Sequence, residues 1–329
     1  MIQYLRGARP GPDAEMKPET YPPDPNVFLT EKCGRACLFC SARGEDRAMT
    51  TAQVRAVLRR AHPALVFEGG EPLLAPGLEN WVRAARLTGT TDITLLTNGL
   101  LLTPERRRTL VRAGVNHFHF NFPSHLPAAH DALTGTKGRL GAQLTAIKEA
   151  AASGPEAAAL VCVVTSLNFR HLPAYVSFAA REFPGLHYIA FNLVKFKGAV
   201  RKRPDLVPDL REAGPRLLAA LRRARKLGLP CLVDGVPLCF LRGFEAYSRD
   251  ADKLLRGDRT YLREKKPVKA CANCGLSSLC PGPRADYAAL RGERGFRAAP
   301  PGAAIAVTRL LRRGQLTLNA RPESPRKRR

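Results

Sequence analysis

Cysteine is the residue whose number and spacing in this sequence point most directly to chemistry. The chain has nine cysteines, and seven of them fall in two groups, one within residues 33–40 and one within residues 239–280. In a reducing compartment, grouped cysteines bind metals or carry out redox chemistry rather than form structural disulfides. The sequence therefore predicts two metal or redox centres in a cytoplasmic protein.

The first group is Cys33, Cys37 and Cys40, with the spacing C-x3-C-x2-C. Three thiolates within eight residues can wrap one small cluster, and Gly34 lets the loop curl tightly. A four-iron cluster held by three cysteines leaves one iron free to bind a substrate or cofactor. Zinc is the alternative, although structural zinc sites use four ligands arranged in C-x2-C pairs.

The second group is Cys271, Cys274 and Cys280, and Cys239 lies upstream of them. Together these four thiolates form a complete set for a closed metal centre, which an iron–sulfur cluster or a zinc ion could occupy. Cys231 is the alternative fourth ligand, because it stands only eight residues before Cys239. Cys162 lies in an apolar run and is expected in the core.

Six short β-type runs alternate with helix-length amphipathic segments, and this pattern predicts a parallel sheet of right-handed βαβ units. The strands are expected at 25–32, 64–70, 92–99, 116–122, 159–166 and 186–194. The helices are expected at 51–60, 77–87, 104–113, 140–152, 172–182 and 210–227. The predicted fold class is α/β, either a partial barrel or a doubly wound sheet, and the alternation is expected to stop after Gly228.

The expected domain organisation follows composition. Residues 1–24 form a Pro-rich arm, 25–205 the barrel, 206–228 a basic linking helix, 229–299 a small Cys-containing domain, and 300–329 a basic extension with a disordered end. The content of 45% hydrophobic and 25% charged residues excludes collagen-like, coiled-coil and wholly disordered chains. No apolar run approaches the roughly 18 residues that a membrane-spanning helix requires.

The fourth expected strand divides its side chains between two faces. Three phenylalanines share one face and are expected to pack under helices, while His119 and Asn121 face the barrel interior. Active sites of βα barrels lie at the carboxyl ends of the strands, so Asn168 and Asn192 are further interior candidates. His119 is either a catalytic residue or a hydrogen-bonded core histidine.

Four motifs in the expected order resemble those of the radical S-adenosylmethionine (SAM) enzymes, over about residues 25–200. The cysteine triplet carries the aromatic Phe39 before its last cysteine, and Gly69-Gly70-Glu71-Pro72 matches the family's GGEP motif. Thr97-Asn98-Gly99 ends the third strand as in many members, and the segment 130–135 (HDALTG) resembles the family's H-D-x-L-T-G sequence.

The resemblance implies a partial (βα)6 barrel that cleaves SAM to a 5′-deoxyadenosyl radical, which removes hydrogen from a substrate. Cys33, Cys37 and Cys40 would bind the [4Fe-4S] cluster that chelates SAM. The resemblance implies that Phe39 lies near the adenine of SAM and that the GGEP segment lies at its ammonium group. The full set of residues that it places at SAM is Phe39, Gly69, Gly70, Glu71, Pro72, Asn98, Asn121, Ser124 and Asn168. Pro123 departs from an acidic residue often found there, so the details of ribose recognition differ.

The second cysteine group resembles the auxiliary-cluster domains called SPASM or, in shortened form, twitch. Pro281-Gly282 and Tyr287 follow it as in that pattern, and the cysteines suffice for one auxiliary [4Fe-4S] cluster. Pro237-Leu238 before Cys239 favours Cys239 over Cys231 as the fourth ligand.

The resemblance implies an oxidoreductase or maturase acting on a peptide or a cofactor precursor, with flavodoxin or ferredoxin as electron donor. The formal net charge of +25 leaves another class open, a nucleic-acid-binding protein with structural metal sites. A radical SAM enzyme that modifies RNA would combine the two hypotheses. The basic residues are scattered through the expected helices, without an interleaved aromatic motif for base stacking.

Overall fold

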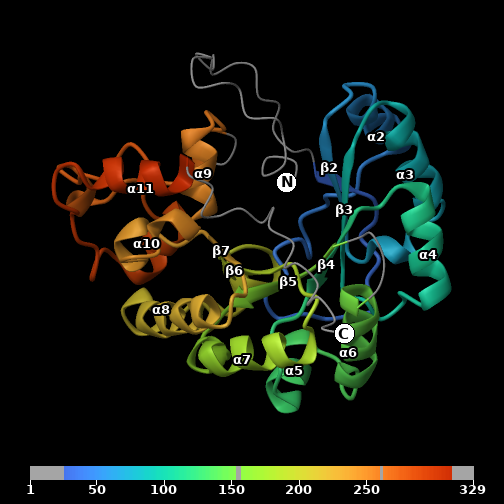
Figure 1. Ribbon diagram of the computed structural model, residues 1–329, viewed down its shortest axis with the longest axis horizontal. Coiled ribbons are helices and arrows are strands. Elements are labelled where there is room, and N and C mark those ends of the chain that lie inside the picture. Colours follow the sequence, from blue (N-terminus) through green and yellow to red (C-terminus); the bar gives the residue numbers. More distant parts are fainter. Residues whose placement is uncertain (1–25, 153–156, 260–261, 313–329) are drawn as a thin grey trace, which may run out of the picture.

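The structure is a computed structural model that describes residues 26–152, 157–259 and 262–312 (Figure 1). The N-terminal arm predicted over 1–24 and the end of the basic extension lie outside these described residues.

A curved sheet of parallel strands forms the centre of the described chain, and its strands follow one another in sequence order. The strands are β1 (Asn26–Phe28), β2 (Ala64–Glu68), β3 (Asp92–Thr97), β4 (His117–Asn121), β5 (Ala157–Val164), β6 (Tyr188–Leu193) and β7 (Cys231–Asp234). All neighbouring strands pair in parallel, and β1 and β7 form the two edges. This open parallel sheet confirms the partial-barrel prediction, with one strand more than expected.

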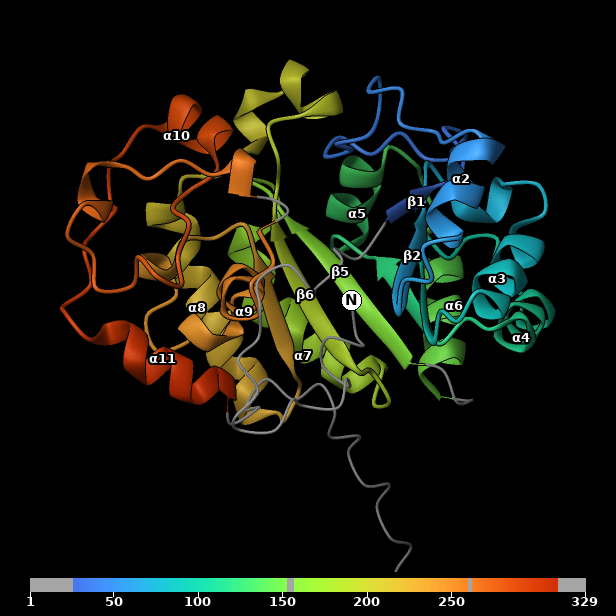
Figure 2. The same ribbon diagram turned by 90° about the horizontal axis from the view of Figure 1, so that it is seen from above.

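Helices connect the strands and cover the outer face of the sheet (Figure 2). They are α2 (Thr51–Leu58), α3 (Leu78–Leu87), α4 (Pro104–Ala113), α5 (Pro127–Thr134), α6 (Leu140–Ala152), α7 (Leu172–Glu182) and α8 (Leu210–Lys226). Side-chain caps begin several of them; Thr50, for example, accepts a hydrogen bond from the Gln53 amide, and the Gln53 side chain accepts one from the Thr50 amide.

The additional strand β7 continues the alternation beyond Gly228, where it was expected to stop. The helix predicted as a linker, α8, is the crossover that carries the chain from β6 to β7. Its apolar stripe, including Leu217 and Leu221, is buried in the main core. The four residues of β7 stand between Pro230 and Gly235, and so short a run carries almost no periodic pattern.

The two faces of the sheet bury different side chains, as the alternation of β4 predicted. Phe118, Phe120 and Phe122 have 0% exposure and join the core under the helices, where each contributes about 1.5–3 kcal/mol by its burial. On the concave face, His119 contacts Tyr188, which belongs to a separate small cluster with residues such as Ala190. The concave face therefore carries the polar side chains that β4 was expected to present.

The C-terminal region packs beside the β6 and β7 side of the sheet, through α9 (Arg249–Leu255), α10 (Ala285–Arg291) and α11 (Ala303–Arg312) (Figure 1). Arg284, only 3% exposed, donates hydrogen bonds to the carbonyls of Leu193 and Val194 at the end of β6. The Tyr287 hydroxyl accepts a hydrogen bond of 2.9 Å from the Leu210 amide. These buried contacts fix the region against the carboxyl end of β6.

In the described ranges, no helix combines the length and hydropathy needed to cross a membrane.

Candidate functional site

The first cysteine group follows the carboxyl end of β1. The loop after β2 is hydrogen-bonded to the residues between β1 and this group. The Gly70 amide donates to the Thr30 carbonyl at 2.6 Å, and the Glu71 amide donates to the Lys32 carbonyl at 2.8 Å. These bonds continue the β1–β2 pairing beyond both strands. The GGEP segment therefore lies directly against the chain that leads into Cys33.

The two glycines of that segment allow this close approach of backbones. A Cβ atom on Gly69 would lie 2.7 Å from the Thr30 carbonyl oxygen, and one on Gly70 would lie 2.4 Å from that of Lys32. Sequence reasoning gave these glycines the task of approaching SAM. In the structure, the space that they leave is filled by the segment before Cys33.

We expect Gly70→Ala to displace the cysteine loop, because the new methyl group meets backbone atoms that cannot rotate away. Overpacking of this kind costs about 1–3 kcal/mol, and iron bound per chain after anaerobic reconstitution should fall. Gly141→Ala is the matched control, since nothing lies within 4 Å of a Cβ there, and in α6 it should stabilise by up to about 1 kcal/mol. Equal iron content and stability in both variants would contradict this role of Gly70.

The HDALTG segment holds the cysteine loop from a second side. The Ala36 amide donates to the Thr134 carbonyl at 3.1 Å, and the Leu38 amide donates to the Leu133 carbonyl at 2.9 Å. Gly135 ends α5 with a φ of 63°, and a Cβ there would lie 2.6 Å from the Ala36 carbonyl oxygen. This motif thus serves as the support of the loop that carries the thiols.

The segment after β6 closes the cysteine loop from a third side. The Ala199 amide donates to the Cys40 carbonyl at 2.9 Å. The Glu45 carboxylate accepts from the Gly198 amide at 3.1 Å and forms ion pairs with Lys197 and Arg201. Elements from both halves of the sheet therefore fix the loop.

Burial and nearby charges shift the pKa values of Cys33 and Cys37. Burial raises the pKa of Cys33, and Cys40 and Glu71 raise it further. Burial also raises the pKa of Cys37 to about 12, opposed by the positive charge of Arg35. The Arg35 amide donates a hydrogen bond to Cys33 Sγ at 3.4 Å. Hydrogen bonds to ligand sulfurs and nearby charges are the means by which proteins adjust iron–sulfur clusters.

Among the described residues, no three His, Cys, Asp or Glu side chains converge as a ready site for a single metal ion. The cysteines of both groups are free thiols. Their donor chemistry fits thiolate-bound iron, and a set of three at the carboxyl ends of the strands fits a cluster with one open iron.

The side chain of Glu71, a residue of the segment expected at SAM, makes its hydrogen bonds within the protein. It is 1% exposed, and its carboxylate accepts hydrogen bonds from the Thr97 hydroxyl at 2.6 Å and the Asn98 amide at 2.8 Å. It also accepts from the Leu73 amide at 3.2 Å, while burial raises its pKa. Glu71 thus ties the loop after β2 to the end of β3, which leaves the backbone of the GGEP segment as the part available to a ligand.

Three further predicted residues also make contacts within the protein. The Asn98 side chain accepts from the Leu100 amide, and the Ser124 hydroxyl accepts from the Leu126 amide. Asn168 is 2% exposed and donates to the carbonyls of Pro123 and Val163 at 2.8 Å each.

Two of the predicted residues lie in the buried interior. Phe39, 5% exposed, belongs to the main core, and Pro72 begins a short 3-10 helix in the loop after β2 and is buried. The fold therefore uses both side chains for packing.

Asn121 retains an atom for a ligand, because its Oδ1 is buried without a hydrogen-bonding partner. Asn192 Oδ1 shares this property, and both residues lie at the carboxyl ends of their strands, β4 and β6. An unpaired buried carbonyl oxygen is costly unless a donor meets it. The concave end of the sheet therefore has two acceptors ready for a polar ligand such as SAM or substrate.

Gln143 is the main site residue that sequence reasoning missed. It has 0% exposure, and its Nε2 donates to the carbonyls of Asn98 at 2.7 Å and Asn121 at 2.9 Å. Its Oε1 lies 2.9 Å from His130 Nε2 and 3.3 Å from Arg35 Nη2. One side chain on α6 thus joins the ends of β3 and β4, α5 and the cysteine loop. The sequence could have indicated its burial, because this polar residue lies in the apolar stripe of α6.

His119 is a hydrogen-bonded interior histidine. Its Nε2 lies 2.9 Å from the Tyr188 hydroxyl, and burial lowers its pKa well below the usual range. Of the two alternatives for this residue, the geometry supports the core role, since the ring is 3% exposed and paired across the sheet.

The second cysteine group comes together in the C-terminal region. Burial, together with the nearby thiols of Cys280, Cys271 and Cys274, raises the pKa of Cys239 to about 11. The Ala299 amide donates to Cys274 Sγ at 3.3 Å. Backbone amides of Arg297 and Gly282 donate to Cys239 and Cys280 respectively. Backbone amides therefore donate to three of the four thiols, those of Cys239, Cys274 and Cys280.

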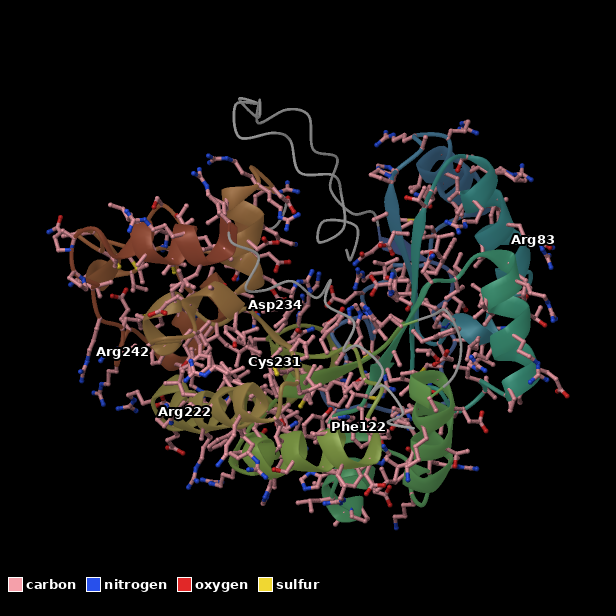
Figure 3. All side chains as sticks on the ribbon, viewed as in Figure 1. Arg83, Phe122, Arg222, Cys231, Asp234 and Arg242 are labelled. Carbon is pink, nitrogen blue, oxygen red and sulfur yellow. The ribbon has the colours of Figure 1, made fainter. Side chains whose placement is uncertain are left out.

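Cys231 and Cys162 lie apart from both groups. Cys231 is 1% exposed on β7, among the core side chains under the helices, and its thiol lies 3.8 Å from the Leu229 carbonyl (Figure 3). Cys162 has 0% exposure on β5. Burial raises the pKa of both thiols, as expected for cysteines that serve in packing.

Comparison with known proteins places this arrangement in a family. Residues 27–179 match the Radical SAM superfamily model. The chain is 31% identical over 204 residues to a PqqA peptide cyclase of Gluconobacter oxydans, covering 59% of this chain and 56% of the relative. It is 34% identical over 165 residues to a GTP 3′,8-cyclase of Mycolicibacterium smegmatis, covering 46% and 45%. The chain thus spans about half the length of these curated relatives.

A solved structure shares the fold over most of the chain. The structure described as native anSMEcpe with bound AdoMet and Kp18Cys peptide aligns with a TM-score of 0.57 and 14% identity, covering 90% of this chain and 99% of that one. At this identity the likeness concerns the fold alone. The family match spans the cysteine loop, the GGEP segment and the strand ends that surround them, so residues 27–179 form a domain of the radical SAM superfamily.

Proposed function

We propose that this chain is a radical SAM oxidoreductase or maturase with one auxiliary [4Fe-4S] cluster. The observation that carries the proposal is the presence of two separate thiol sets, three at the carboxyl ends of the strands and four in the docked C-terminal region. A cluster at Cys33, Cys37 and Cys40, with SAM on its open iron, would supply a 5′-deoxyadenosyl radical that removes a hydrogen atom from substrate. Asn121 and Asn192 would meet polar groups of the bound molecules through their unpaired oxygens.

The auxiliary set would lie where electrons can leave the substrate. Arg284 follows the last cysteine of that set by four residues and is hydrogen-bonded to the end of β6. Asp286 accepts a hydrogen bond from the Phe196 amide at 2.9 Å, in the segment after β6. These contacts support an auxiliary domain within 229–299 that faces the carboxyl end of the sheet.

A peptide is the substrate class that we propose. The relative from Gluconobacter oxydans is named a PqqA peptide cyclase, and the solved structure of similar fold holds a peptide. The relative named GTP 3′,8-cyclase makes a small cofactor precursor the alternative. A low-potential protein such as flavodoxin or ferredoxin would supply the electron that starts each turnover.

Formation of one cross-link in a peptide removes two hydrogen atoms from it. One would leave as a hydrogen atom and form 5′-deoxyadenosine, and the other would leave as a proton and an electron. Cys239, Cys271, Cys274 and Cys280 would hold the cluster that can accept this electron. The test is mass spectrometry of a candidate peptide incubated with the reduced, anaerobically reconstituted full chain and SAM. We expect the peptide to lose two hydrogens while 5′-deoxyadenosine forms. If 5′-deoxyadenosine forms with GTP and with none of the peptides tested, the substrate is a small molecule and the peptide proposal is wrong.

The fourth auxiliary ligand can be assigned by a pair of variants. We expect Cys239→Ala to reduce the iron content from about eight to about four per chain, because its thiol neighbours Cys271, Cys274 and Cys280. Cys231→Ala should keep about eight irons and lose some stability, since its thiol packs in the core on β7. Loss of iron in the Cys231 variant alone would reverse the assignment.

A further inference from the structure

Arg35 is a buried cation in the cysteine loop, between Cys33 and Cys37. Its residue is 4% exposed, and its Nη2 donates to Gln143 Oε1 at 3.3 Å. The Nε and Nη1 atoms are buried and have no hydrogen-bonding partner within the described protein. A guanidinium cannot shed its charge in a protein, and buried donors without acceptors are costly. We therefore expect these N–H groups to donate to an anionic acceptor that is present when the protein is functional.

The groups around Arg35 identify that acceptor. The charges that act on it come from the thiols of Cys37 and Cys33 and the carboxylates of Glu71 and Asp131. Glu71 already accepts hydrogen bonds from Thr97, Asn98 and Leu73. Asp131 accepts from the Gly138 amide at 3.0 Å. Of these four groups, the thiols of Cys37 and Cys33 act most strongly on Arg35, and a cluster bound there would bring sulfur acceptors to the two free N–H groups.

Gln143 fixes the direction of the guanidinium. Its Oε1 receives Arg35 Nη2, while its Nε2 is anchored on the carbonyls of Asn98 and Asn121. With Nη2 held in this way, the planar guanidinium and its two unpaired donors, Nε–H and Nη1–H, are fixed in one orientation. A rigid, preorganised fork of this kind donates in a fixed geometry, which a flexible ammonium group cannot do.

We propose that Arg35 donates its free Nε–H and Nη1–H to sulfur atoms of the cluster bound by Cys33, Cys37 and Cys40, and that its charge makes this cluster easier to reduce. The inference rests on the proposed function. Reduction adds one electron from an external donor and breaks no bond, while Arg35 stays protonated. Because the reduced cluster carries one more negative charge, a fixed cation beside it stabilises the reduced form more than the oxidised form. Arg35 is thus a positioning residue that acts on the potential.

The test is a redox titration of the anaerobically reconstituted full chain with dithionite, followed by electron paramagnetic resonance. The signal that changes on addition of SAM identifies the cluster at the cysteine triplet. At the wild-type midpoint, we expect Arg35→Met to lower the ratio of reduced to oxidised cluster about tenfold, which equals about 59 mV for one electron. Arg35→Lys keeps the positive charge and loses the planar set of N–H donors. Its ratio of reduced to oxidised cluster should therefore lie between those of the wild type and Arg35→Met.

Arg43→Met is the matched control. Arg43 also acts on Cys37 and donates to the Arg35 carbonyl at 2.8 Å, but it is exposed to solvent. Water screens its charge, so the ratio should change by less than about twofold. An unchanged ratio in Arg35→Met, or an equal loss in Arg43→Met, would overturn the proposal.

If Arg35→Met fails to retain iron, Arg35→Lys decides. If the lysine variant has the wild-type ratio of reduced to oxidised cluster, the proposal that the guanidinium N–H groups donate to the cluster is wrong. A lower ratio would support it. Failure of the proposed function is distinguishable, because the unaltered chain would then show no signal that responds to SAM.

Discussion

Cys37→Ala will abolish the formation of 5′-deoxyadenosine, whereas Cys274→Ala will retain it and lose only the modified product. Cys37 belongs to the loop fixed by β2, α5 and the segment after β6, and each thiol there is needed to hold a cluster with three protein ligands. Cys274 belongs to the separate set, where the Ala299 amide donates to its sulfur. Chromatography with mass spectrometry of the nucleoside and of the substrate measures both outcomes.

Cys162→Ala is the control for this pair. Its thiol is buried in β5 and lies 3.7 Å from the Pro123 carbonyl, apart from both cysteine groups. Removal of a small core side chain should cost about 1 kcal/mol of stability and leave the nucleoside yield unchanged. Equal loss of 5′-deoxyadenosine in Cys37→Ala and Cys274→Ala would contradict the division into a catalytic and an auxiliary cluster.

Gln143→Leu will lower the free energy of unfolding by about 3 kcal/mol or more, because it leaves several buried polar groups unpaired. The carbonyls of Asn98 and Asn121 lose their donor, and Arg35 and His130 lose their acceptor. Leucine has nearly the same size, so the effect isolates the hydrogen bonds from the packing. Denaturant unfolding of the chain without cluster measures it.

The matched control is Gln53→Leu, which removes the other glutamine of the described helices. Gln53 closes the exposed capping box at the start of α2, and loss of such a cap costs about 1 kcal/mol. If the two variants lost equal stability, Gln143 would not be the buried junction that its four contacts indicate.

The sequence predicted the sheet well where periodicity was strong. In β4 the alternation of Phe118, His119 and Phe120 assigned both faces correctly, because side chains on a strand alternate with period two. The helix α5 and the strand β7 were missed for different reasons. Helix α5 has eight residues within a recognised motif, and β7 has four residues between Pro230 and Gly235, so both are too short for a periodic pattern to identify them.

At the site, the cysteines could be chosen from spacing, but the tasks of their neighbours could not. Glu71 and Asn168 lie at the carboxyl ends of the strands, as predicted, and their side chains form hydrogen bonds within the protein. A sequence motif identifies which residues meet, whereas hydrogen bonds across 45 or more positions, such as that between Gln143 and Asn98, depend on how the elements pack. The junction at Gln143 could therefore be recognised only in three dimensions.

The positive charge remains the least predicted feature. Arg83 on α3 lies on the opposite side of the molecule from Arg222 on α8 and Arg242 after β7 (Figure 3). Basic side chains therefore occur on more than one side of the molecule. The proposed function rests on the thiol sets and not on the charge.

The most direct test of the account is the iron, sulfide and zinc content of the anaerobically reconstituted full chain. Two four-iron clusters predict about eight irons and about eight sulfides per chain, and about four of each in Cys37→Ala and in Cys274→Ala. Zinc without sulfide at either cysteine group would contradict the central claim that this chain carries one cluster for SAM and a second for the electron.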